Sequence, residues 1–443
     1  MTPNKALTRW FFIVLAAALL VRAGLYFVYP LAQSNDTPTY LHLASSLGNH
    51  GFENYNGTRT PGYPFFILLT GSQAVLYPLQ LGLGVLTTLL VFTCAWQLTG
   101  LPWLAGLLAL AHTLNLGQLF FEAALLSESL ATFLLFAVLA GFLSLWQPRP
   151  AGLPPVPLRG WMFLAGTGLA AAALALVRPL FAPVAFWGAL FLALFWQSAP
   201  WKTRWCAALL AALPAVIALG LWVNFIHIRF KIWGLDSIGG YHSVNHVSSF
   251  FELAPPEYAT VTDTFLKFRA VRLAESGSPV NTIWDAIPAL MQQEKLNYYG
   301  LGRLMGQISR RLILENPALY ARNLVWGWWW FWRVGVFWLP ETISSAGLRS
   351  ALKELMLAER LALFGVNLLF LAGSLTLLWR RVRARLNPPL FFWFAVSAVW
   401  LISLLQTLAE HGDNPRFLAP MQTLVLLIVA WALAQFIPTA RKV

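Results

Sequence analysis

Long apolar segments recur along almost the whole 443-residue chain, and most are long enough to cross a lipid bilayer as helices. Inside a bilayer, backbone polar groups must be satisfied within the protein, which leaves helices as the natural form of such segments. We therefore expect an all-α polytopic membrane protein with about ten transmembrane helices. The expected spans are roughly residues 10–30, 74–98, 102–119, 127–146, 161–177, 179–197, 205–226, 361–379, 390–408 and 417–437.

The composition supports this class of protein. Charged residues make up 11% of the chain and hydrophobic residues 58%, whereas a soluble domain carries about 25% charged residues. Both cysteines, Cys94 and Cys206, lie within apolar segments, so the sequence excludes a disulfide framework.

The basic residues are concentrated on one side of the predicted membrane. If the N-terminus is cytoplasmic, the segments on that side hold only basic charges, as the positive-inside rule requires. These are Lys5, Arg9, Arg149, Arg159, Lys202, Arg204, Arg380, Arg381, Arg383, Arg385, Arg441 and Lys442. The net charge of +13 therefore indicates topology, and we do not expect a nucleic-acid partner.

The first apolar segment is too long for a typical signal-peptide core and is interrupted by Arg22, so we expect a retained helix. Arg22 either pairs with a carboxylate inside the helix bundle or extends outward to the membrane surface. The sequence alone leaves these two alternatives open.

A polar segment, Ala32–Pro64, lies within the first external loop, residues 31–72. Apolar residues at helical spacing predict a short helix on the membrane over Asp36–Leu47, capped at its start by Asn35 or Asp36 and ended by Gly48 and Gly51. The sequence RTPGYP then predicts a rigid, tight turn.

A second external segment covers residues 226–360. We expect its first part to be irregular, residues 282–314 to form amphipathic helices, and the tryptophan-rich stretch 323–340 to be a helix at the outer interface rather than a span. The predicted organisation is an N-terminal transmembrane module over 1–225, the external segment over 226–360, and C-terminal helices over 361–443.

The candidate reactive groups all lie on the external side. They are Asp36, Arg59, Glu122, Glu128, Arg178, Glu410, His411, Asp413 and Arg416. No P-loop, dinucleotide fingerprint, HExxH or CxxC pattern occurs, which disfavours a nucleotide-dependent enzyme or pump. A substrate carried by a lipid phosphate could reach these groups, because arginine suits phosphate and a carboxylate can accept a proton from an attacking hydroxyl.

The patterns NDTPTYLHLASSL, GTRTPGYPFF, LLSES and EHGDNPRFLAPM resemble those of the GT-C glycosyltransferases. More narrowly, they are similar to the bacterial branch related to protein O-mannosyltransferases and the lipid A aminoarabinose transferase. The resemblance implies a GT-C type fold in the bacterial inner membrane. It also implies transfer of a sugar from a polyprenyl-phosphate donor to an extracytoplasmic lipid, glycan or protein acceptor, with inversion at the anomeric carbon.

The resemblance also implies roles for individual residues. Asp36 matches the catalytic aspartate of the first loop, and Glu128 matches a second acidic position. Arg59 and Arg416 match basic residues that approach the donor phosphate. Further substrate-binding candidates are Tyr40, Tyr63, Arg178 and His411. An arginine common before Asn224 is replaced here by Val223, which departs from the pattern.

Several alternatives remain at this stage. Glu122 is expected to be a solvated loop residue, and His242 and His246 have metal-ligand spacing without an obvious third ligand. No cofactor is required by the sequence, although a divalent metal stays open. The alternative functions are a polymerase or ligase of lipid-linked glycans and, from another class, a transporter or flippase, which the absence of internal repeats disfavours.

Overall fold

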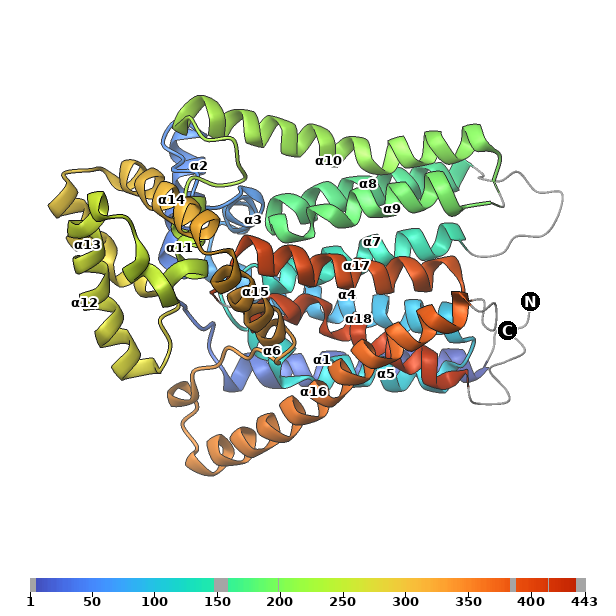
Figure 1. Ribbon diagram of the computed structural model, residues 1–443. Coiled ribbons are helices and arrows are strands. Elements are labelled where there is room, and N and C mark those ends of the chain that lie inside the picture. Colours follow the sequence, from blue (N-terminus) through green and yellow to red (C-terminus); the bar gives the residue numbers. More distant parts are fainter. Residues whose placement is uncertain (1–4, 147–157, 198, 383–387, 413, 436–443) are drawn as a thin grey trace.

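The computed structural model describes residues 5–146, 158–197, 199–382, 388–412 and 414–435. Within these residues the fold is built from helices, and the only strand-like pairing is an isolated bridge between Ala32 and Ala124. Long helices lie side by side in a bundle, and a group of shorter helices covers one of its ends (Figure 1).

Eight helices in the described part of the chain are long and apolar enough to cross a membrane. They are α1 (Lys5–Val28), α4 (Gln73–Thr99), α7 (Glu128–Trp146), α8 (Leu158–Val177), α10 (Trp201–Phe230), α16 (Ala346–Val382), α17 (Leu390–Ala409) and α18 (Asn414–Ala434). Each corresponds to a predicted span, so the expected polytopic all-α class is confirmed.

The other two predicted spans have a different form. The expected helix over 102–119 is broken into α5 (Pro102–Leu114) and α6 (Leu116–Glu122), which are bent by 57°. Asn115 causes the break: its backbone is extended, and its side chain accepts a hydrogen bond from the Gln118 amide at the start of α6. The expected helix over 179–197 is the shorter α9 (Ala182–Phe195), which follows a 3-10 turn.

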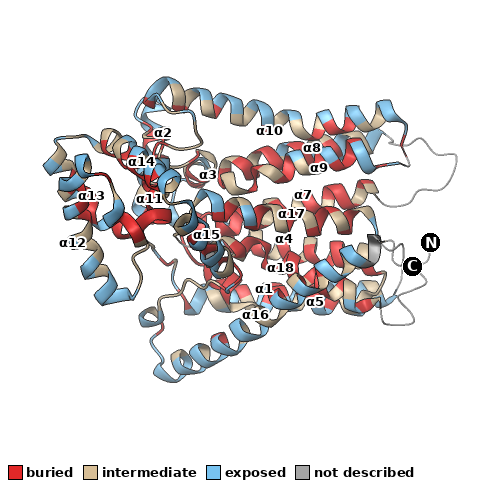
Figure 2. Ribbon diagram, viewed as in Figure 1, coloured by how far each residue is buried: buried red, intermediate tan, exposed pale blue. Residues whose placement is uncertain are grey.

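The outer faces of the bundle are apolar and exposed. On α1, for example, Leu20 and Phe27 are 73% and 83% exposed, as expected for side chains that contact lipid. Figure 2 shows the complementary pattern, with buried residues on the inward faces of the bundle.

The start of α1 and the end of α18 lie at the same end of the bundle (Figure 1). The basic residues at the starts of α1, α8 and α10, among them Lys5, Arg159 and Lys202, lie at this end. The acidic site residues described below lie at the opposite end, so the charge segregation expected from sequence has a structural counterpart.

The shorter helices form the opposite end of the molecule. They are α2 (Thr37–His50), α3 (Gly62–Thr70), α11 (Gly239–Val247), α12 (Ala259–Ser276), α13 (Thr282–Glu294), α14 (Tyr298–Glu315) and α15 (Pro317–Phe331). Those from α11 to α14 enclose a hydrophobic core separate from that of the bundle, with Tyr241, Phe251, Phe265 and Leu301 fully buried.

The external segments differ in detail from the sequence-based expectations. Part of the stretch expected to be irregular forms α11. Helix α2 continues through Gly48 and stops before Gly51, whose positive φ of 58° favours glycine. Asp36 occupies the N-cap position of α2, but its side chain makes no capping hydrogen bond, because it has charged partners elsewhere.

The tryptophan-rich stretch 323–340 is only partly helical. Helix α15 ends at Phe331, and the residues after it form a turn and then irregular chain up to a short 3-10 turn at Pro340. Trp332 is fully buried, while Trp328 stacks on Trp400 of α17 and donates a hydrogen bond to Ser403. This stretch therefore packs on the bundle, and α15 is not among the helices long and apolar enough to span a membrane.

Candidate active site

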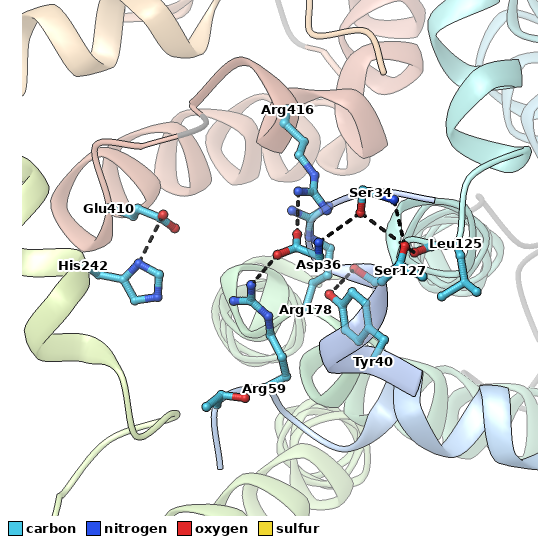
Figure 3. A network of polar contacts seen from close by, with 12 residues as sticks. Ser34, Asp36, Tyr40, Arg59, Leu125, Ser127, Arg178, His242, Glu410 and Arg416 are labelled. Carbon is cyan, nitrogen blue, oxygen red and sulfur yellow. Dashed lines mark hydrogen bonds and ion pairs between the residues drawn. The ribbon is translucent and has the colours of Figure 1, made fainter. Parts of the chain in front are cut away.

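Segments from distant parts of the chain converge where the bundle meets the external helices (Figure 3). Two of them are the segment before α2 and the segment before α7. A backbone bridge fixes these two: the Ala32 amide donates to the Ala123 carbonyl, and the Leu125 amide donates to the Ala32 carbonyl. The Thr37 hydroxyl also contacts the Leu125 carbonyl at 3.3 Å. These contacts hold the start of α2 beside the start of α7, so Asp36 and Glu128 lie in one site.

The RTPGYP turn lies directly against the end of α8. A Cβ atom at Gly62 would lie 2.6 Å from the backbone of Leu176 and Val177, so only glycine fits this close approach. The turn thereby holds Arg59, its first residue, next to Asp36, and Arg178, just after α8, next to Glu128.

Asp36 is bound by two arginines. Arg59 donates from Nη2 to Oδ1 and Arg416 donates from Nη1 to Oδ2, each at 2.7 Å. Burial alone would raise the pKa of Asp36, but the two guanidinium groups lower it to about 2. Because of this low pKa, the carboxylate is ionised at neutral pH. The side chain remains 24% exposed, so a ligand can reach it.

Glu128 is the buried partner of this carboxylate. It forms ion pairs with Arg178, at 2.8 Å, and with Arg416, and its side chain is 1% exposed. Arg416 therefore bridges the two carboxylates. Three guanidinium groups facing two carboxylates leave an excess positive charge, which favours an anionic ligand.

Two tyrosines that the sequence predicted as substrate-binding residues, Tyr40 and Tyr63, pack next to this charged cluster. The Tyr40 hydroxyl contacts the Ser127 hydroxyl at 3.4 Å, and its ring meets that of Tyr63 edge-on. Tyr63 is fully buried and donates a hydrogen bond to Gln80 Oε1 at 2.7 Å. Its fixed ring in turn holds the ring of Tyr40. Arg178 lies over the ring of Phe417, 4.9 Å from its centre.

The structure adds a pair that sequence reasoning did not connect. His242 of α11 lies 3.1 Å from Glu410, just after α17 (Figure 3). Burial alone would lower the pKa of His242 and raise that of Glu410. The charges of the pair outweigh burial: Glu410 raises the pKa of His242, and His242 lowers the pKa of Glu410. This ion pair joins the external helices to the loop that precedes Arg416.

His411 lies beside this pair, with its ring centre 5.9 Å from that of His246. Burial lowers the pKa of both imidazoles, that of His246 to about 4. Within the described residues, no three histidine, cysteine, aspartate or glutamate side chains converge as metal ligands. Asp413, a further candidate, lies outside the described residues.

The His242–Glu410 pair predicts a pH-dependent stability difference. The raised pKa of His242 gives stabilisation that is lost as pH rises above about 6.5, and the lowered pKa of Glu410 gives stabilisation that is lost as pH falls below about 4.5. We expect His242→Gln to lower stability by about 1 kcal/mol between these limits. Thermal unfolding of both proteins across pH would measure the difference, with the exposed His50→Gln as control; a difference that keeps growing above pH 7 would contradict the ion-pair account.

Glu122 was expected to be a solvated loop residue, and this expectation is wrong. Its side chain is fully buried and receives two hydrogen bonds from Arg22, at 2.7 and 2.8 Å. Glu122 is the last residue of α6, which follows the bend after α5, and its side chain reaches Arg22 of α1. Of the two alternatives for Arg22, the structure therefore shows pairing inside the bundle.

No protein-family model and no curated protein matches the sequence. Among solved structures, the archaeal oligosaccharyltransferase AglB from Archaeoglobus fulgidus, in complex with an inhibitory peptide and a dolichol-phosphate, aligns with a TM-score of 0.50 and 16% identity over 96% of this chain. A second A. fulgidus oligosaccharyltransferase structure, tethered to an acceptor peptide containing the NVT sequon, also has a TM-score of 0.50, with 14% identity over 96% of this chain. The chain has a GT-C type fold.

The GT-C fold accounts for nearly the whole chain, but the chain spans only about half the length of the oligosaccharyltransferases it matches. Five of the sequence-predicted residues, Asp36, Arg59, Glu128, Arg178 and Arg416, form one connected charged cluster in this fold. Tyr40 and Tyr63 lie beside it, whereas His411 belongs to the neighbouring histidine group. Their roles remain predictions.

Proposed function

We propose that the chain is a membrane glycosyltransferase that transfers a sugar from a polyprenyl-phosphate donor to an extracytoplasmic acceptor. The observation that carries the proposal is an accessible carboxylate, Asp36, held between two arginines at the end of the bundle opposite the basic segments. The fold supports it: one structural neighbour holds a dolichol-phosphate and another an acceptor peptide. The bacterial inner membrane and the narrower bacterial branch are part of the proposal.

The arginines suggest how the donor activates the base. A donor phosphate that binds Arg59 and Arg416 would compete with Asp36 for their hydrogen bonds. As these partners shift to the phosphate, the pKa of Asp36 would rise from about 2 toward the usual aspartate value. Asp36 thus becomes a better base when the donor is in place.

The chemical step is a single displacement. Asp36 takes the proton of the acceptor nucleophile, which attacks the anomeric carbon while the bond from that carbon to the donor phosphate oxygen breaks. Arg59 and Arg416 stabilise the phosphate as it takes up the bonding electrons. Glu128, which contacts Arg178 and Arg416, holds these arginines in place. One displacement inverts the anomeric carbon.

The external helices from α11 to α15 would cover the site and select the acceptor. The His242–Glu410 pair connects them to the loop before Arg416. The acceptor class, whether lipid, glycan or protein, is tested by mass spectrometry of envelope lipids, glycans and proteins from cells with and without the protein. We expect one class to lack a single-sugar increment in cells without the protein, and the wild-type chain to restore it. Identical envelopes in cells with and without the expressed protein would argue against the proposal.

Arg416→Lys tests the bridging arginine. A lysine provides one compact charge and cannot bond Asp36 and Glu128 through two separate nitrogens, as Arg416 does. We expect kcat/KM for the lipid-linked donor to fall by about 10- to 100-fold, equivalent to about 1.4–2.8 kcal/mol. Steady-state kinetics would measure this. The exposed Arg322→Lys on α15 is the control and should leave kcat/KM unchanged; equal losses in both variants would contradict the bridging role.

A further inference from the structure

A polar cleft of about 420 Å³ lies on the external side and shares no lining residue with the Asp36 cluster. It is formed by the first external loop, the end of α10 and the start of α14, which adjoin in Figure 1. Its lining residues are Asn54, Tyr55, Asn56, Arg229, Phe230, Lys231, Asn297, Tyr299 and Arg303. Three are cations and none is a carboxylate.

The cations of this basic cleft lack acidic partners. Among the described residues, Arg229, Lys231 and Arg303 form no ion pair, although Arg229 donates a hydrogen bond to the Glu53 carbonyl. Other external arginines, Arg269 and Arg272, are paired with carboxylates. The positive charge of the cleft is therefore free to meet a ligand's negative charge.

The N-terminus of α14 adds to the preference of the cleft for an anionic ligand. Helix α14 begins in the cleft, because Asn297 is its N-cap and Tyr299 lies in its first turn, so the positive end of its dipole faces the opening. The cleft is also held in shape: Tyr299 and Ser237 both donate hydrogen bonds to the Asn56 carbonyl.

The position of the cleft indicates where the ligand comes from. Arg229 and Lys231 lie at the end of α10, one of the helices that can span the membrane, so the cleft opens at the external membrane surface. The positive-inside rule disfavours basic residues on this side of the membrane. The dipole of α10 favours Arg229 and Lys231 at its C-terminal end, but no helix dipole favours Arg303, which lies near the N-terminal end of α14.

We propose that the basic cleft binds the phosphate group of an anionic lipid at the external membrane surface. Arginines and a lysine from two helices would contact the phosphate oxygens, and the amides of Asn54 and Asn297 would accept or donate hydrogen bonds to the adjoining polar headgroup. This site is separate from the donor-phosphate site and does not depend on the proposed transfer reaction.

The test uses the full chain in detergent, titrated with phosphatidylglycerol or phosphatidylcholine and analysed by native mass spectrometry. The variant Lys231→Asn with Arg303→Gln removes two cations; asparagine suits the positive φ of 60° at position 231. We expect it to bind phosphatidylglycerol at least about tenfold more weakly than wild type. Arg310→Gln, an exposed arginine on α14 outside the cleft, is the matched control and should bind as wild type does.

Further measurements keep the test decisive. Arg303→Gln alone, at an exposed position, replaces the double variant if that one fails to fold, and Arg303→Lys should restore most of the binding. Displacement of the lipid by inorganic pyrophosphate would show that the phosphate alone is recognised, whereas lipid binding without displacement would assign the site to the whole headgroup. Equal binding of the two lipids, or equal losses in the cleft and control variants, would overturn the proposal.

Discussion

Asp36→Asn should reduce sugar transfer by about 10²- to 10⁴-fold, the range expected for loss of a general base. Asparagine keeps the size of the side chain and one hydrogen-bond acceptor, but it cannot take a proton from the acceptor. Because Arg59 and Arg416 lose their charged partner at this position, they should remain available to the donor phosphate. We therefore expect donor binding to be kept or strengthened while transfer is lost.

Single-turnover transfer from a labelled polyprenyl-phosphate sugar, together with a separate donor-binding measurement, would distinguish these effects. Asp263→Asn is the matched control, since Asp263 lies exposed on α12 and forms no ion pair among the described residues. Full transfer activity in Asp36→Asn would exclude this residue as the base. Loss of both donor binding and correct folding would instead assign Asp36 a structural role.

The sequence predicted the fold class and most of the charged cluster because both depend on local signals. Apolar runs report spans directly, and Asp36, Glu128, Arg178 and Arg416 each stand next to such a run, at the end of a span. Ends of helices that leave a membrane on one side must lie at similar depth. This alone brings the four residues to one surface, even though they are far apart in the sequence.

The contacts within the site could not be read from sequence. The bridge between Ala32 and Ala124 sets which loop lies against which, and it uses backbone groups that every residue has. The pairing of His242 with Glu410 depends on how the separate core of the external helices sits on the bundle. Asn115, in contrast, carried a signal for the break after α5, because an asparagine within an apolar run favours a cap.

The largest effect on stability is expected from the buried pair Arg22–Glu122. Removing one partner, as in Arg22→Met or Glu122→Met, leaves an uncompensated buried charge or forces the remaining group to rearrange, which costs about 3–5 kcal/mol. Gly84 shows how closely the pair is enclosed: a Cβ atom there would lie 2.2 Å from Glu122 Oε2 and 2.4 Å from Arg22 Nε. The surroundings leave little room for relaxation.

The double variant, Arg22→Met with Glu122→Met, separates stability from chemistry. It removes both charges and replaces them by apolar side chains of similar length, so we expect it to recover most of the stability lost by either single variant. Thermal unfolding and monodispersity in detergent would measure this. Within the described residues, the pair forms no hydrogen bond or ion pair with Asp36 or Glu128, so transfer activity per folded molecule should stay near wild type. A stable but inactive double variant would mean that these buried charges take part in the reaction, and the proposed mechanism would have to include them.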